Sequence, residues 1–238
     1  MRIQLIAAVL LLTGCAHSPS YDPQDPLEPM NRRVYAFNQK VDQYVAKPLA
    51  ETYVAATPDE FRSGIHNFLS NLAYVRVIAN DLLQAKFVIA GRDSTRLLMN
   101  TTFGLAGFLD PATLVGLERR SEDFGQTLGY WGVGEGWFLM LPFLGPTTNR
   151  DLVGQGGDYF TNPMELADIE GRRSLAYQGM TLVDLRSSLL GTEGVLREQF
   201  DPYVFLRGIY LQRRQNLIYD GNPPPEDDFE DEDEGKSG

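Results

Sequence analysis

The sequence predicts an all-α domain, and two observations lead to that fold class. The first is a dipeptide, typical of helix starts, in which a short polar residue precedes proline. Proline is tolerated at the first helical position, where its missing N–H has no partner, and the preceding side-chain oxygen can accept a hydrogen bond from a free amide. The dipeptide occurs five times, at Asp25-Pro26, Thr57-Pro58, Asp110-Pro111, Asn162-Pro163 and Asp201-Pro202. Three of these starts also carry a glutamate at the capping-box spacing: Glu28, Glu60 and Glu165.

The second observation is the spacing of apolar residues at steps of three and four, which predicts amphipathic helices. Such stripes run over residues 27–44, 61–82 and 175–189, and we expect the second to bend near Asn71. Residues 193 to about 215 are predicted to form one long further helix that ends before Gly221. Core packing explains each stripe most simply, and lipid contact is the alternative.

Residues 124–146 differ from the rest of the chain, because they contain six glycines and both tryptophans. Glycine weakens both helix and strand, so we expect a compact irregular segment with one or two short elements. Aromatic residues beside glycines can lie at a membrane interface, where tryptophan and tyrosine are enriched. Alternatively, the segment folds inward over the core, and the sequence leaves both possibilities open.

The N-terminus has the pattern of a lipoprotein signal peptide. Met1 and Arg2 give a positive start, and residues 3–12 form an apolar run well below the roughly 20 residues that span a bilayer. Residues 12–15 (LTGC) match a lipobox and end at the only cysteine of the chain. We therefore expect cleavage before Cys15 and N-acyl and S-diacylglycerol groups on it, and no other cofactor. Ala16, in place of an aspartate, favours the outer membrane of a diderm bacterium.

Composition divides the chain into four parts: a signal peptide (1–14), a flexible tether (15–24), one helical domain (25–221) and a disordered acidic tail (222–238). Much of the net charge of −11 lies in residues 226–236, which hold eight acids and one lysine behind a proline-rich hinge. The tail serves solubility or docks a basic partner or a cation. Nucleic acid is an unsuitable partner, since no basic cluster offsets the acidity.

The sequence also argues against most enzymes. It lacks a nucleophile elbow, a phosphate-binding loop and the common metal motifs. His17 lies in the tether, which leaves His66 as the one imidazole of the domain. Four aspartates are candidates for acid–base work, but their spacing singles out no pair: Asp110, Asp123, Asp151 and Asp158. We therefore expect neither a catalytic site nor a metal site.

The chain resembles the MlaA (VacJ) family of outer-membrane lipoproteins from residue 25 to about residue 221. The matching blocks are 25–32 (DPLEPMNR) with Tyr35, Phe37 and Asn38; Asn67-Phe68 with Asn71; 80–84 (NDLLQ); 100–104 (NTTFG); 123–129 (DFGQTLG); 141–146 (LPFLGP); Arg150-Asp151; and Asp201-Pro202-Tyr203 with Arg207, Tyr210 and 212–214 (QRR). One departure is visible at Trp137 and Phe138, where the family usually has proline and tyrosine.

The resemblance implies a single ring-like helical domain, partly embedded in the outer membrane on its periplasmic side and associated with trimeric porins. It also implies an amphipathic channel that takes phospholipids from the outer leaflet and passes them to a soluble periplasmic carrier of the Mla system. Two alternatives are a porin-associated structural lipoprotein without transport activity and a phospholipase that uses His66 with an aspartate.

Two sets of side chains are our candidates for direct contacts. We expect four aromatic residues to contact the bilayer or a porin: Trp131, Trp137, Phe138 and Phe143. Three arginines could lie near phosphate head groups or an acidic partner, since guanidinium pairs with phosphate bidentately: Arg207, Arg213 and Arg214. Surface salt bridges to nearby glutamates are the alternative for these arginines.

Overall fold

The computed structural model describes residues 22–162 and 171–224, and most of them are helical. In chain order the elements are α2 (Glu28–Val41), a π-helical turn (Asp42–Ala46), α3 (Lys47–Ala56), α4 (Asp59–Leu83), α5 (Phe87–Phe103), α6 (Pro111–Leu114), α7 (Phe124–Tyr130), β1 (Phe138–Leu141), β2 (Gly145–Thr148), α8 (Asn149–Asp158), a short 3-10 turn (Tyr159–Thr161), α10 (Arg172–Ser188), a second 3-10 turn (Leu190–Thr192), α11 (Glu193–Arg197) and α12 (Pro202–Ile218). The all-α prediction is confirmed, with the addition of an antiparallel β1–β2 hairpin.

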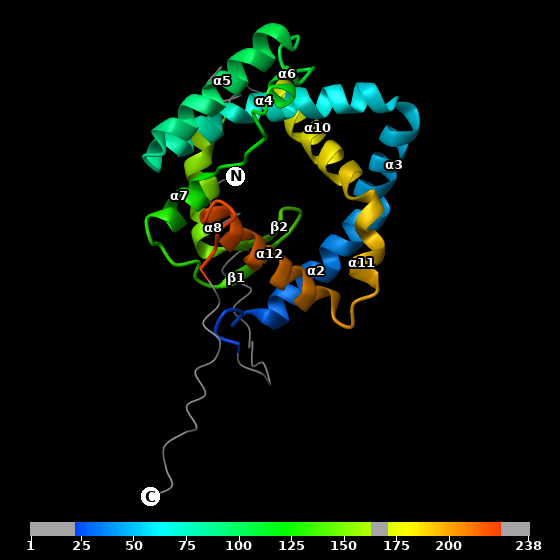
Figure 1. Cartoon of the computed structure of the whole chain (residues 1–238). Helices are drawn as coiled ribbons and strands as arrows, with labels where there is room; N and C mark the ends of the chain where they lie inside the picture. Colours follow the sequence, from blue (N-terminus) through cyan, green and yellow to red (C-terminus); the bar gives the residue numbers. More distant parts are fainter. Residues whose placement is uncertain (1–21, 163–170, 225–238) are drawn as a thin grey trace, which may run out of the picture.

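The helices are arranged as a ring around an open centre (Figure 1). Packing contacts close the ring: α2 lies on β1, β2 on α8, α8 on α7, α7 on α4, α4 on α10, and α10 on α3, which continues from α2. The ring-like shape expected from the family resemblance is therefore present.

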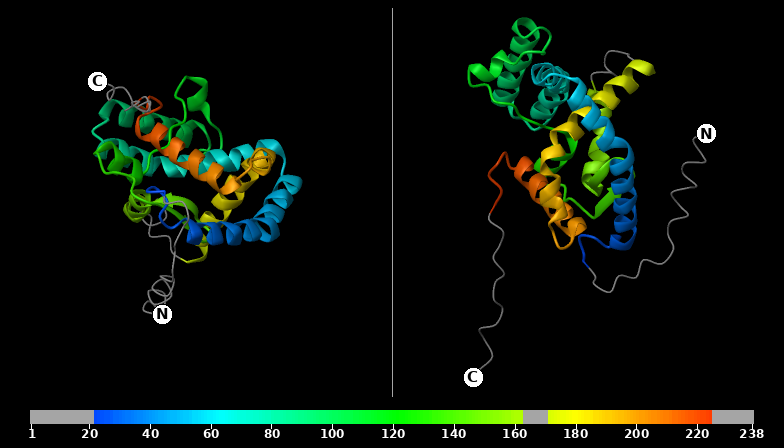
Figure 2. Two further views of the ribbon diagram at one scale, coloured as in Figure 1. Left: turned by 90° about the horizontal axis from the view of Figure 1, so that it is seen from below. Right: turned by 90° about the vertical axis from the view of Figure 1, so that its right-hand side faces the viewer.

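Helix α12 lies on one face of the ring, and α2 lies toward the opposite face (Figure 2). Between them is a small apolar core of Phe138, Met140 and Tyr203, with Val34, Tyr35, Leu206, Tyr210 and Leu211 packed around it. The Phe138 and Tyr203 rings meet edge to face, with 6.1 Å between their centroids. This core fixes the hairpin between the two helices.

Two of the five expected helix caps are confirmed by hydrogen bonds. Asp110 accepts from the amide of Thr113, and Asp201 accepts from the amides of Tyr203 and Val204. The expectation is wrong for Asp25 and Thr57, because neither side chain caps the helix that follows. Asp25 instead turns inward to bind side chains. The helix expected at Pro163 lies outside the described residues.

The predicted long helix over residues 193–215 is wrong. The structure has two helices there, α11 and α12, separated by residues 198–201. The physical reason is Pro202, which has no N–H to donate and disfavours a helical conformation in the residue before it. Asp201 is accordingly extended, with φ −129° and ψ 96°, and starts a new helix. Helix α4 runs from Asp59 to Leu83 as one element through Asn71.

Two asparagines of α2 complete the free edge of strand β1. The Asn31 side chain donates to the carbonyl of Phe138 (3.1 Å) and accepts from the amide of Met140 (2.9 Å). Three residues further on, where β1 ends and the turn begins, the Asn38 side chain donates to the carbonyl of Leu141 (2.9 Å) and accepts from the amide of Phe143 (2.9 Å). The Asn31 carboxamide thus takes the place of a residue of a neighbouring strand, so the helix covers an edge that would otherwise be unpaired.

The distribution of polar and apolar side chains is unusual. Among the described residues, ten apolar side chains are buried, against eighteen polar or charged ones. Large apolar side chains instead cover much of the exposed surface, for example Phe87, Phe103 and Phe160. Extensive apolar surface of this kind marks contact with a protein or a membrane. Within the described ranges, no helix combines the length and the apolar character needed to cross a bilayer.

We predict that Asn31→Ala destabilises the domain by about 2 to 4 kcal/mol, because it removes the partner of two buried backbone groups of β1 and the hydrogen bond from Asn31 to Asp25 Oδ1 (2.7 Å). Unfolding of the detergent-solubilised protein in urea provides the measurement. Arg33→Ala is the matched control, since Arg33 is exposed on the same helix. Equal stability of the two variants would contradict the role assigned to Asn31.

Candidate functional site

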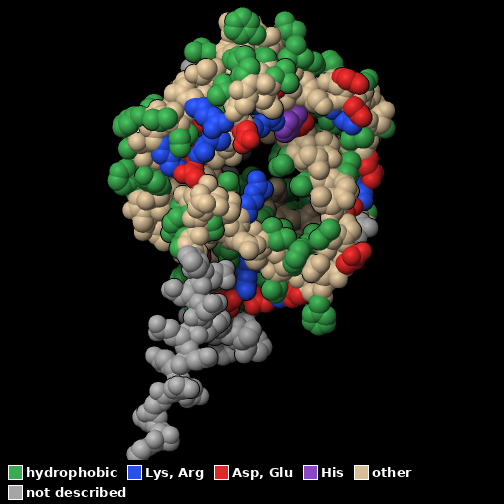
Figure 3. All heavy atoms as spheres, viewed as in Figure 1, with side chains coloured by type: hydrophobic (Ala, Val, Ile, Leu, Met, Phe, Trp, Pro, Cys, Tyr) green, Lys and Arg blue, Asp and Glu red, His purple; other side chains and the backbone are tan. Residues whose placement is uncertain are grey.

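The candidate site is the centre of the ring. In the space-filling view the molecule is hollowed there, and Lys, Arg and His side chains gather along the upper rim (Figure 3). Hydrophobic side chains line much of the side toward α10. An opening with basic groups on one side and apolar groups on another complements a phospholipid, which joins a phosphate to acyl chains.

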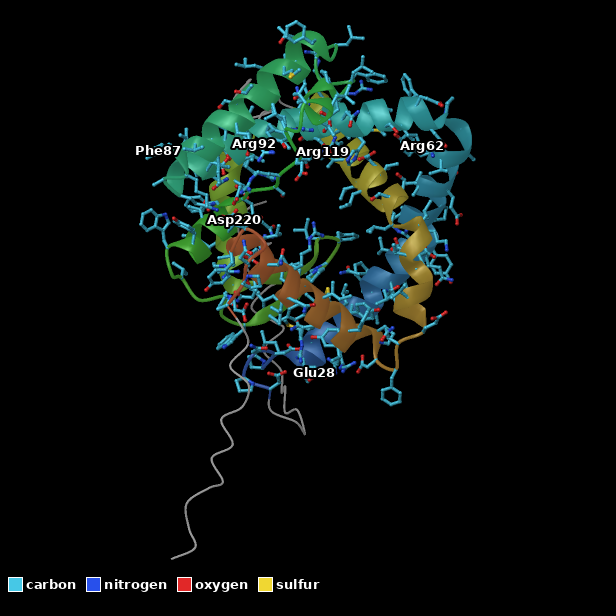
Figure 4. All side chains as sticks on the ribbon, viewed as in Figure 1. Glu28, Arg62, Phe87, Arg92, Arg119 and Asp220 are labelled. Carbon is cyan, nitrogen blue, oxygen red and sulfur yellow. The ribbon has the colours of Figure 1, made fainter. Side chains whose placement is uncertain are left out.

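The upper rim is formed by α4, α5 and the segment that joins α6 to α7. Arg119 and Arg92 lie at its inner edge (Figure 4). The Arg119 guanidinium is anchored by Asn67 Oδ1 (2.8 Å), Ser70 Oγ (3.4 Å) and Asp110 Oδ2 (3.0 Å). This arrangement fixes a positive charge beside the opening.

Asp110 connects this rim to the buried side of α5. Its Oδ2 also accepts from Arg96 (2.5 Å), and its Oδ1 accepts from Asn100 (3.0 Å). Burial opposes ionisation, but hydrogen bonds from Thr113, Asn100 and the two arginines outweigh it and hold the pKa of Asp110 far below its ordinary value. Two guanidiniums therefore share one carboxylate, which leaves a positive charge in excess.

His66 pairs with Asp184 and thereby joins α4 to α10. Its Nδ1 lies 2.8 Å from Asp184 Oδ2. Only 8 % of Asp184 is exposed, whereas 48 % of the His66 side chain is exposed. His66 is the purple side chain at the rim in Figure 3, because the other histidine of the chain lies outside the described residues.

A second polar cluster lies at the turn between α4 and α5. The Asp81 and Asp93 carboxyls lie next to each other, and both residues are fully buried. Burial, together with neighbouring Asp93 and Glu122, raises the pKa of Asp81 to about 7. Burial also raises the pKa values of Asp93 and Glu122. Because two buried like charges repel, this pair favours holding one proton at neutral pH.

Arg120 connects this carboxyl pair to Asp220 at the end of α12, and Lys86 connects Glu122 to the same residue. Arg120 Nε lies 3.8 Å from Asp93, and its Nη2 donates to Asp220 (2.5 Å). Lys86 Nζ also lies 2.5 Å from Asp220 and 3.5 Å from Glu122. Side chains from α5, from the segment before α7 and from the C-terminal end of α12 therefore meet at one joint of the ring.

Another joint of the ring fastens α12 to α7 and α8. Arg214 donates two hydrogen bonds to Asp123 (2.6 and 2.9 Å) and one to Asp151 (2.9 Å). Burial acts to raise the pKa of Asp123, but the hydrogen bonds and the charge of Arg214 outweigh burial and lower this pKa to about 2. Gly125 permits this approach, because a Cβ there would meet Asp151 at 2.7 Å and Arg214 at 2.8 Å. We call this joint, which lies inside the protein, the Arg214 clamp.

The three arginines predicted to contact head groups have three different environments. The prediction is wrong for Arg214, which is 8 % exposed and bound to Asp123 and Asp151. Arg207 is held by Asp22 (2.7 Å) and Asp25 (3.1 Å). Arg213 is exposed and has no ion pair within residues 22–162 and 171–224. It lines a cavity of about 760 Å³ with Glu135 and Gln212, among others.

The four aromatic residues predicted to contact a bilayer or a porin also differ in their exposure. Trp131, Trp137 and Phe143 are exposed, with exposed fractions of 64 %, 52 % and 70 %. The prediction is wrong for Phe138, which is 0 % exposed because alternate residues of β1 point into the core. The segment therefore turns Phe138 inward over the core and leaves the other three side chains exposed. Whether the exposed three contact a bilayer or a porin stays a prediction.

The aspartates considered for acid–base work have structural roles. Asp110, Asp123 and Asp151 are bound by arginines, and Asp158 Oδ1 accepts from the amide of Phe124 (2.9 Å) and from Asn80 (3.3 Å). In the part of the chain that the structure describes, no group of three His, Cys, Asp or Glu side chains is placed to hold a metal ion. The predicted signal peptide, Cys15 and nearly all of the acidic tail lie outside the described residues.

We predict that stability falls as pH rises through about 7, by about 1 to 3 kcal/mol, because Asp81 has a higher pKa in the folded protein than in the unfolded one. This contribution is complete below the unfolded pKa near 4 and is lost above the folded pKa. Asp81→Asn should flatten the dependence between pH 5 and pH 8, measured by urea unfolding in detergent. Asp59→Asn, an exposed carboxylate of the same helix, should not flatten it.

Comparison with known proteins agrees with this architecture. Residues 23–217 match the family described as MlaA lipoprotein. The intermembrane phospholipid transport system lipoprotein MlaA of Escherichia coli (strain K12) is 36 % identical over 237 residues, covering 95 % of this chain and 93 % of the relative. The protein of that name from Haemophilus influenzae is 33 % identical and covers 93 % of each chain.

A solved structure reported as the structural basis for maintenance of bacterial outer membrane lipid asymmetry also matches. It is 34 % identical, with a TM-score of 0.73, and the match covers 83 % of this chain and 99 % of that chain. The family profile spans most of the sequence, and the relatives are similar over nearly their whole length. The chain therefore belongs to the MlaA lipoprotein family.

Proposed function

We propose that this protein is the outer-membrane lipoprotein of an intermembrane phospholipid transport system and maintains the lipid asymmetry of that membrane. Its family consists of transport lipoproteins rather than enzymes. In this proposal it removes mislocalised phospholipids from the outer leaflet through the centre of the ring. A soluble periplasmic carrier then receives them.

The observation that supports the proposal is the distribution of side chains in the ring, which is polar between its helices and apolar on much of its surface. Polar and ionic side chains fill the joints between helices, basic groups lie along the inner rim, and large apolar side chains lie exposed. A passage for phospholipids requires a polar wall for head groups and apolar surface for acyl chains. It requires no nucleophile and no metal ion.

The exposed aromatic residues Trp131, Trp137 and Phe143 would place the ring within the membrane beside a trimeric porin. Tryptophan is enriched at membrane–water interfaces, where its apolar ring is buried and its N–H stays near water. The Trp131 N–H is already satisfied by the carbonyl of Leu83 (3.1 Å), which leaves its exposed ring free to contact an apolar partner. Phe143 packs edge to face on Phe37 of α2, with 5.2 Å between the ring centroids, and is itself exposed.

The first test combines Trp137→Glu with Phe143→Glu in cells that lack the wild-type protein. We expect phospholipid to accumulate in the outer leaflet, detergent sensitivity to rise and porin copurification to fall, since charges oppose burial in an apolar surface. Gln178→Glu serves as the control, because it adds a charge at an already polar exposed position. Unchanged lipid clearance and porin binding in the double variant would remove this surface from the proposal.

Photocrosslinking separates the conduit from a porin-bound scaffold that moves no lipid. A photoreactive residue placed at successive positions of α4 and α10 should capture phospholipid inside the ring. Capture of porin alone, at outer positions only, would favour the scaffold.

A separate test concerns the lipid anchor. We predict that Cys15→Ala abolishes delivery to the outer membrane, because acylation of this thiol is the sorting signal. Membrane fractionation by density measures the outcome. The variant protein should be absent from the outer-membrane fraction, and wild-type amounts there would contradict the predicted lipidation.

A further inference from the structure

Arg119 has hydrogen-bond donors that its protein partners do not use. A guanidinium carries five N–H groups in a planar fork. Asn67 and Asp110 take both hydrogens of Nη2, and Ser70 takes one of Nη1. Within the described residues, Nε and the second hydrogen of Nη1 have no partner. The side chain is 34 % exposed at the inner rim of the ring, so these donors can reach a ligand there.

His66 offers a further donor on the same face of α4. Its Nδ1 is committed to Asp184, so Nε2 is the nitrogen left for a ligand. Nε2 donates to a ligand only in the imidazolium form, because a neutral ring that donates its Nδ1 hydrogen to Asp184 has Nε2 as an acceptor. Ser70 follows His66 by four residues, which places the two side chains one above the other on the helix. Since Ser70 also contacts Arg119, the imidazole and the guanidinium border one patch of the rim.

The anchors of both groups are themselves fixed. Asp110 is held by Arg96 and Asn100, and Asp184 is largely buried. Side chains positioned in advance lose little entropy when they bind, and a guanidinium fork matches two phosphate oxygens. Because Asp110 is shared by Arg96 and Arg119, it compensates the charge of Arg119 only in part, and a monoanionic ligand would compensate the rest.

We propose that Arg119 and His66, with Ser70 between them, bind the phosphodiester of a phospholipid head group at the inner rim of the ring. Asp184 is the positioning residue for the imidazole. The proposal rests on the proposed function for the choice of a lipid as ligand. A purely structural role, in which Arg119 only fastens its segment onto α4, makes different predictions.

The test measures binding to the full-length lipidated protein in detergent by titration calorimetry. The three probes are a water-soluble short-chain phospholipid (dihexanoyl-phosphatidylglycerol), the same diacylglycerol without phosphate, and inorganic phosphate. We expect Arg119→Gln and His66→Gln each to weaken phospholipid binding roughly tenfold, the scale of one lost charge-assisted contact. Binding of the diacylglycerol should not change.

Arg119→Lys keeps the charge but loses the fork, and it should bind phospholipid with intermediate affinity. Arg33→Gln is the matched control for lost charge, because Arg33 is exposed on α2 and has no ion pair in the part of the chain described. Its affinity should stay within twofold of wild type. Thermal unfolding of each variant identifies one that has lost its fold, and in that case Arg119→Lys and His66→Gln carry the test.

Three results would overturn the inference. One is unchanged phospholipid affinity in folded Arg119→Gln and His66→Gln. Another is an equal loss for phospholipid and diacylglycerol, as a structural role predicts. The last is inorganic phosphate binding as tightly as phospholipid, which would make the patch a free-anion site. The proposed function fails separately, if cells without the protein keep phospholipid out of the outer leaflet.

Discussion

A ring one helix thick cannot bury a large apolar core, and this constraint governs the rest of the structure. Each helix has a neighbour on either side, while its remaining faces meet the central opening or the surroundings. Among the described residues, the one cluster of buried apolar side chains lies where α12 adds a second layer over the β-hairpin, around Phe138, Met140 and Tyr203. Elsewhere, directional polar contacts join several of the helices. The Arg214 clamp and the pair of His66 with Asp184 are such joints.

Buried ionic joints are costly unless every partner is present, and breaking one usually destabilises more than the pair itself contributes. They also specify geometry, since a guanidinium fork accepts few arrangements. At the Arg214 clamp a Cβ on Gly125 would lie 2.7 Å from Asp151 and 2.8 Å from Arg214, so a side chain there would crowd the pair. The ring is therefore held in one shape by contacts that tolerate little sliding, which suits a passage whose width must be maintained.

Sequence patterns predicted what is local and missed what depends on the ring. Caps at Asp110 and Asp201 follow from neighbouring residues, and both exist. Helix α5 was not predicted because its buried face is mostly polar, with Asp93, Arg96 and Asn100 at the helical spacing, whereas its large apolar side chains are exposed or half-buried. The spacing of apolar residues therefore did not indicate which face of α5 is buried. The pairing of Asn31 with Phe138 spans 107 residues and left no sign in either segment.

Arginines show why basic residues alone do not identify a ligand site in such a protein. Arg213 and Arg214 are adjacent in sequence, yet one is exposed and the other closes the clamp, because successive helical positions differ by about 100°. A ring built from ionic joints uses most of its guanidiniums internally. What distinguishes a ligand contact is then a fork with donors left over beside the opening. Arg119 and Arg214 each use three of their five N–H groups, but Arg119 is 34 % exposed beside the opening, whereas Arg214 is buried in the clamp.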